Sequence, residues 1–96
     1  MTTAQLAARL QRAIATGQTI VFDHGSLTVK FIPRNADGNR LLLLASSGGR
    51  IPATTCTTIG AAAGVPSGTE WHFRLADTVA YCEWPAPVEQ RRTVQP

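Results

Sequence analysis

The chain has 96 residues, of which 44% are hydrophobic and 16% charged, and its formal net charge is +3. This apolar content excludes a disordered chain, and the length leaves room for a single domain. The sequence has no run of the roughly 18 apolar residues that a membrane span needs, and it begins with no secretory signal. We therefore expect a cytoplasmic protein with no membrane partner.

The positive charge is carried almost entirely by arginine, because eight arginines accompany a single lysine, Lys30. The planar guanidinium group binds phosphate and carboxylate through two parallel hydrogen bonds, so one interpretation is an anionic partner. A GC-rich genome also produces an arginine-rich and alanine-rich composition. The charge alone does not decide between these two explanations.

The first expected element is a helix over residues 3–16. Thr2 or Thr3 supplies its N-cap, and Gly17 ends it. Apolar side chains recur at three- and four-residue spacing and form one stripe, made of Leu6, Ala7, Leu10, Ala13 and Ile14.

A hairpin is expected next, with strands over residues 18–23 and 26–32 joined by a tight turn at His24 and Gly25. The predicted cross-strand pairs are Phe22 with Leu27 and Ile20 with Val29. Alternation then predicts a buried face made of Ile20, Phe22, Leu27, Val29 and Phe31.

After a loop over residues 33–39, a third strand is expected over residues 40–45, and four consecutive leucines, Leu41–Leu44, make both of its faces apolar. Two interpretations remain open. Other elements of the same chain cover both faces, or one face meets a second copy in a homodimer through Leu41–Leu44.

A second helix is expected from about residue 53 to residue 63, ended by Gly64 and Pro66. Residues 59–69 (Ile-Gly-Ala-Ala-Ala-Gly-Val-Pro-Ser-Gly-Thr) resemble the helix-turn-helix of the tetracycline-repressor family of DNA-binding proteins. That resemblance implies nucleic-acid binding through residues 53–73. From residue 70 onward, however, the apolar residues alternate as in a strand, so the alternative is a simple helix end.

A closing hairpin is expected from strands over residues 70–75 and 78–84, joined through Ala76 and Asp77. Its predicted buried pairs are Trp71 with Cys82 and Phe73 with Ala80, and Leu75 shares their face. Its predicted outer pairs are His72 with Tyr81 and Glu70 with Glu83. The proline- and arginine-containing residues 85–96 are expected to form a flexible C-terminal tail after a single domain of residues 1–84.

Together these elements predict an α+β domain with the order α-β-β-β-α-β-β. A small antiparallel sheet of about five strands would pack against an N-terminal helix and a short second helix. Cys56 and Cys82 lack the close spacing and the further ligands of a metal site, so we expect two buried free thiols.

We expect no catalytic, cofactor-binding or metal-binding residues, and therefore no enzyme. The adjacent Asp23 and His24 would point to opposite faces of a strand, and the polar cluster around His72 lacks a nucleophile. The expected function is a small protein-interaction or regulatory module, of the kind that phages and other mobile elements encode. The alternative is a nucleic-acid-binding regulator that uses a basic surface and residues 53–73. The candidate binding surface comprises His72, Arg74, Tyr81, Glu83, Arg91 and Arg92.

Overall fold

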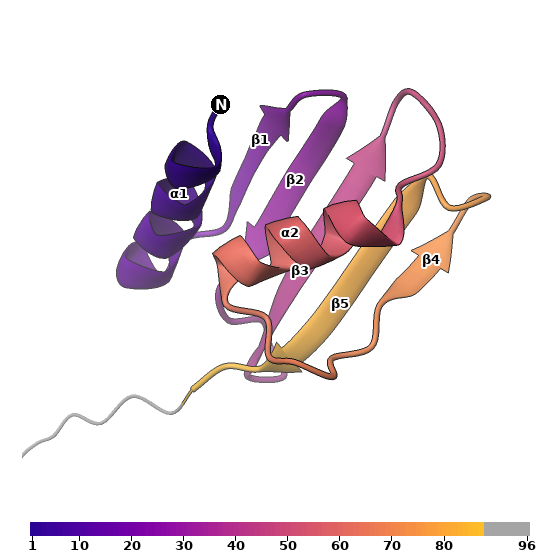
Figure 1. Cartoon of the computed structure of the whole chain (residues 1–96). Coiled ribbons are helices and arrows are strands. Elements are labelled where there is room, and N and C mark those ends of the chain that lie inside the picture. The colour runs from indigo at the N-terminus through magenta and orange to yellow at the C-terminus, as the bar shows by residue number, and fades with distance from the viewer. Residues whose placement is uncertain (88–96) are drawn as a thin grey trace, which may run out of the picture.

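The computed structural model describes residues 1–87, which form two helices and five strands in the order α1-β1-β2-β3-α2-β4-β5 (Figure 1). The strands form one antiparallel sheet with the spatial order β1-β2-β3-β5-β4. This arrangement confirms the predicted α+β class and the predicted element order. The elements are α1 (Thr3–Thr16), β1 (Ile20–His24), β2 (Leu27–Ile32), β3 (Asn39–Ser46), α2 (Ala53–Ala63), β4 (His72–Arg74) and β5 (Val79–Pro85).

Helix α1 begins with a capping box and ends at a left-handed glycine. The hydroxyl oxygen of Thr2 accepts a hydrogen bond from the Gln5 amide at 3.1 Å, and the Gln5 side-chain oxygen accepts one from the Thr2 amide at 2.8 Å. These two bonds satisfy donors that a helix N-terminus otherwise leaves unpaired. Gly17 has a φ of 73°, as expected for a C-cap glycine. The predicted apolar stripe buries Leu6, Leu10 and Ala13.

The first hairpin forms, but its predicted register is wrong. Phe22 pairs with Val29 and Ile20 with Phe31, so the two turn residues are Gly25 and Ser26. Gly25 has a φ of 62°, and a glycine with positive φ at the first central position is characteristic of a type II′ turn. The paired residues are displaced by two, which leaves every side chain on its predicted face. The predicted pairs of Phe22 with Leu27 and of Ile20 with Val29 are therefore absent.

Strand β3 lies in the middle of the sheet, and its leucines divide between the two faces. Leu42 and Leu44 are fully buried in the core beneath the helices. Leu41 and Leu43 point to the other face and are only partly buried. Residues 1–87 therefore cover one face of the leucine strand completely and the other face incompletely.

Helix α2 crosses the face of the sheet that contains Leu42 and Leu44 (Figure 1). It has no side-chain cap at Pro52 and ends at Gly64, whose φ is 81°. Gly60 is buried, and a Cβ atom there would lie 3.1 Å from the ring of Trp71, so the glycine allows that ring to pack closely. No second helix follows Gly64 within residues 65–87, so the recognition helix that the repressor resemblance implies is not formed.

The closing hairpin has the predicted register, with His72 opposite Tyr81 and Phe73 opposite Ala80. The predicted strand over residues 70–75 is shortened to β4, and Glu70 and Trp71 precede it. The predicted burial of Phe73 and Leu75 is wrong, because their side chains are 38% and 75% exposed. The turn is also longer than predicted, since Leu75, Ala76 and Asp77 all have positive φ.

Hydrogen bonds connect the residues at the end of β5 to the loop before β3. The strand continues one residue past its predicted end, to Pro85, and the buried Ala86 donates its amide to the Gly38 carbonyl at 3.1 Å. The guanidinium of Arg34 donates to the Pro87 carbonyl at 3.0 Å. The rest of the predicted tail, residues 88–96, lies outside the described residues.

Candidate functional site

One face of the sheet carries no helix in the described part of the chain, and we call it the open face. Successive side chains of a strand point to opposite faces, so the strand register defines which residues lie on it. Three rows of side chains lie on this face, two that run from β1 to β4 and a shorter one from β2 to β5. They are Val21-Lys30-Leu43-Tyr81-His72, then Asp23-Thr28-Ala45-Val79-Arg74, and finally Ile32-Leu41-Glu83.

The centre of the open face is apolar. Leu43 lies in the middle row of the middle strand, and Leu41 and Ala45 flank it along β3. All three side chains are only partly buried. At the edge strand β1, Val21 is 59% exposed. Apolar side chains therefore remain in contact with water across the middle of this face.

Three residues of the predicted binding surface, His72, Arg74 and Tyr81, come together at one side of the open face. The His72 and Tyr81 rings stack with their centroids 5.1 Å apart and an interplanar angle of 27°. Arg74 donates to the Tyr81 hydroxyl at 3.3 Å, and its guanidinium carbon lies 5.7 Å from the centroid of that ring. Tyr81 thus contacts both an imidazole and a cation.

The fourth predicted residue, Glu83, lies on the same face beside Leu41. Its carboxylate accepts hydrogen bonds from the side-chain amides of Asn35, at 2.8 Å, and Asn39, at 3.0 Å. Because both bonds favour the ionised form, they lower the pKa of Glu83 below its usual value. Arg91 and Arg92, the last two predicted residues, lie outside the described residues.

The opposite side of the open face, on β1 and β2, was not included in the predicted site. Asp23 accepts a hydrogen bond from the Thr28 hydroxyl at 3.2 Å, and both residues are exposed. Lys30 is exposed in the next row, beside Val21. The alternation of β2 places Thr28, Lys30 and Ile32 together on one mixed face, but the sequence does not show that this face continues through β3 to His72.

Formal charges on the described open face are balanced. Asp23 and Glu83 are acidic, whereas Lys30 and Arg74 are basic. Proteins that bind nucleic acid usually gather basic residues on one face, because each contact neutralises a phosphate. The open face lacks such a concentration of positive charge.

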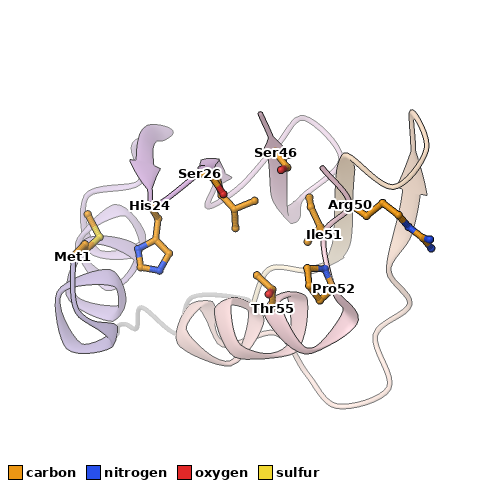
Figure 2. A pocket seen from close by; sticks show the side chains of 10 residues that line it. Met1, His24, Ser26, Ser46, Arg50, Ile51, Pro52 and Thr55 are labelled. Carbon is orange, nitrogen blue, oxygen red and sulfur yellow. The ribbon is translucent and has the colours of Figure 1, made fainter. Parts of the chain in front are cut away.

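A cavity of about 410 Å³ lies between the β1–β2 turn and the start of α2 (Figure 2). His24 lines it, and the Nδ1 atom of this residue is buried without a hydrogen-bond partner. The Arg50 side chain points away from the cavity and forms an ion pair with Asp77 at 2.9 Å. Asp23 lies on the open face, so the adjacent Asp23 and His24 side chains are on opposite faces of β1, as their positions in the strand dictate.

Neither cysteine has the properties of a nucleophile. Cys56 and Cys82 are both buried and not disulfide-bonded, as the sequence predicts. Burial raises the pKa of Cys82 to about 12, with a smaller contribution from nearby Cys56, and burial also raises the pKa of Cys56. Both groups therefore remain protonated thiols at neutral pH, and the thiolate is the reactive form.

Residues 1–87 contain neither a cluster of metal ligands nor a helix that could span a membrane. No group of three or more His, Cys, Asp or Glu side chains there is arranged to hold a metal ion. No helix in that range has the length and apolar character needed to cross a membrane. Comparisons with protein-family models, with curated proteins and with solved structures each find no match for this chain.

Proposed function

We propose that this chain is a non-enzymatic protein-interaction module that binds its partner through the open face. The observation that carries this proposal is the partly buried pair Leu41 and Leu43 at the centre of a sheet face with no helix over it in the described chain. Full burial of a leucine side chain contributes about 1.5–3 kcal/mol relative to full exposure, so covering the part of Leu41 and Leu43 that is still exposed would add a fraction of that amount for each.

The layout of the open face also matches the usual anatomy of a protein interface. Such interfaces have an apolar centre, contain aromatic side chains and arginine, and place charged groups at a polar rim. Here Leu43 marks the centre, Tyr81 and Arg74 supply the aromatic and the arginine, and Asp23 lies at the rim on the edge strand. Catalysis on this face has less support, because Tyr81 and His72 contact each other without a nucleophile beside them.

The nucleic-acid-binding alternative has less support than protein binding. Helix α2 is followed by a loop and β4 rather than by a second helix, and the charges of the open face are balanced. Binding to duplex DNA would show itself as an affinity that falls steeply with salt concentration. A weak dependence on salt is the expected result.

The test is affinity capture from the native host with the full chain and two variants. Leu43→Asp places a charge at the centre of the open face, whereas Gln11→Glu adds the same charge on the exposed side of α1. We expect Gln11→Glu to capture every protein that the wild type captures. Leu43→Asp should fail to capture the partner that binds the open face. Circular dichroism verifies that both variants are folded. Equal capture by all three proteins would show that the open face is not the binding surface.

A further inference from the structure

We propose that the occupant of the open face is a second copy of this chain, related to the first by a two-fold axis that runs along β3. This inference rests on the proposed function, in that the open face must be an interface. In this dimer two sheets pack face to face, with β1 of one copy over β4 of the other and β2 over β5. Two-fold dimers are the commonest protein assemblies.

The position of β3 makes this arrangement geometrically simple. It is the middle strand, with β1 and β2 on one side and β5 and β4 on the other. A two-fold axis parallel to β3, midway between the two facing sheets, places the β1 side of one copy over the β4 side of the other. It leaves each row of side chains at the same position along the strands. Leu43 then meets Leu43 of the second copy on the axis, and stacked sheets about 10 Å apart interdigitate such side chains.

The charges of the open face are complementary under this symmetry. Asp23 and Arg74 occupy the same row at opposite edges of the sheet, so the axis places each Asp23 opposite Arg74 of the second copy. Because the dimer is symmetric, the ion pair occurs twice. Lys30 falls opposite Tyr81, where an ammonium group can lie over an aromatic ring.

The remaining acidic residue, Glu83, meets no like charge. The axis places it opposite Ile32 at the end of the sheet. Its hydrogen bonds to Asn35 and Asn39 draw the carboxylate towards the β2–β3 loop, away from Leu43. Glu83 is also exposed, so this carboxylate can stay hydrated at the rim.

The same charges argue against a two-fold axis that runs across the strands. A two-fold axis across the strands, through the position of Leu43, would place Lys30 opposite Lys30 of the second copy. Like charges that oppose each other at an interface are unfavourable. The observed pattern therefore favours the axis along β3 over the axis across the strands.

The size of the face indicates a reversible dimer. The thirteen residues of these three rows, about 4.8 Å apart across the strands and about 6.8 Å apart along them, cover a flat area of roughly 400 Å². A standard interface buries about 800 Å² of accessible surface on each partner, so this face is at the small end of the range, where association is typically weak and reversible.

The experiment is sedimentation equilibrium of the full chain from about 1 μM to 1 mM, a range that spans the affinity expected for so small an interface. The wild type should change from monomer to dimer across that range. Asp23→Arg alone would oppose two arginines, and Arg74→Asp alone would oppose two aspartates. Each single variant should weaken self-association roughly tenfold or more. Arg12→Asp, on the exposed side of α1, is the matched control and should leave the dimer unchanged.

The decisive step is to mix the two single variants. In the mixed dimer, the Arg introduced at position 23 of one copy faces the Asp introduced at position 74 of the other. The native Arg74 of the first copy faces the native Asp23 of the second. The mixture should therefore form a heterodimer with an affinity within about threefold of the wild type. The double variant, with Asp23→Arg and Arg74→Asp in one chain, should self-associate with a similar affinity. If either residue only stabilised the fold, neither the mixture nor the double variant would restore dimer formation.

Three outcomes would overturn the inference. They are a wild-type monomer at 1 mM, a dimer that neither single variant weakens, and single variants that weaken the dimer without rescue on mixing. If a monomeric wild type still captures a different protein in a way that Leu43→Asp abolishes, the proposed function stands and only the second copy is excluded. If capture is also unaffected by Leu43→Asp, the proposed function fails too.

Discussion

Leu42 and Leu43 are adjacent in β3, yet Leu42 is completely buried beneath the helices whereas Leu43 lies on the open face. The same substitution should therefore have different effects at the two positions. Leu42→Ala removes core contacts and should lower the free energy of unfolding by about 2–5 kcal/mol. Leu43→Ala should lower it by less, roughly 1–2 kcal/mol in the monomer, since Leu43 is only partly buried and loses fewer contacts.

Urea unfolding at low protein concentration, followed by circular dichroism, measures this difference. Low concentration keeps the chain monomeric, so that association does not contribute to the stability of the wild type. Equal losses at the two positions would mean that another part of the chain covers Leu43.

The leucine strand also shows how far the sequence can be interpreted. Four consecutive leucines predict a strand with two apolar faces, and the structure confirms the strand. The sequence leaves open which pair is covered, because that depends on the placement of α2 across the sheet. Coverage of Leu42 and Leu44 is a long-range property that no local pattern contains.

The two hairpins show that alternation predicts which face a side chain takes, whereas the turn decides which residues pair. The register of the closing hairpin follows from alternation and is correct, so His72 and Tyr81 meet as predicted. The register of the first hairpin fails because Gly25 occupies the first central position of its turn and His24 remains in the strand. The displacement by two residues preserves the faces, which is why most of the core was still predictable.

Glu83 gives a prediction about pH. Its pKa is lowered by hydrogen bonds from Asn35 and Asn39, and neither long-range partner could be found from the sequence. A carboxyl whose folded pKa lies below its unfolded value contributes stability above the unfolded pKa and loses that contribution as the pH falls through the folded pKa. Asn39→Ala removes one donor and should raise the pKa of Glu83 towards its usual value.

Nuclear magnetic resonance of the Glu83 side-chain carboxyl, measured from pH 2 to pH 7, reports this pKa directly. Asn35 still donates in the Asn39→Ala variant, so part of the shift should remain. An unchanged pKa would show that the Asn39 bond does not form in solution. A variant with Thr57→Ala, far from Glu83 on α2, serves as the control.

Cys56 and Cys82 should not react with thiol reagents while the protein is folded. Both thiols are buried, and their pKa values are raised, Cys82 to about 12. The thiolate fraction at pH 8 is therefore very small. Reaction with an aromatic disulfide reagent should be slow in buffer and should give two equivalents only after unfolding in guanidinium chloride. Rapid reaction of one equivalent in buffer would show that a thiol is accessible.

In the turn between β4 and β5, three consecutive residues other than glycine adopt the left-handed backbone conformation. Leu75, Ala76 and Asp77 have φ values of 53°, 54° and 68°. The left-handed conformation is unfavourable for an L-residue with a Cβ atom by roughly 1–2 kcal/mol, whereas glycine adopts it readily. Asp77 is needed for its ion pair with Arg50, so Ala76 is the position at which glycine should relieve strain without removing a contact.

Ala76→Gly should therefore stabilise the protein, by a few tenths to about 1 kcal/mol after the greater chain entropy of glycine in the unfolded state is subtracted. Ala61→Gly is the matched control, because Ala61 is exposed in the regular helix α2. There the same change should destabilise by about 1 kcal/mol. Thermal and urea unfolding of the two variants should thus shift in opposite directions. A loss of stability in both would mean that Ala76 does not adopt the left-handed conformation in solution.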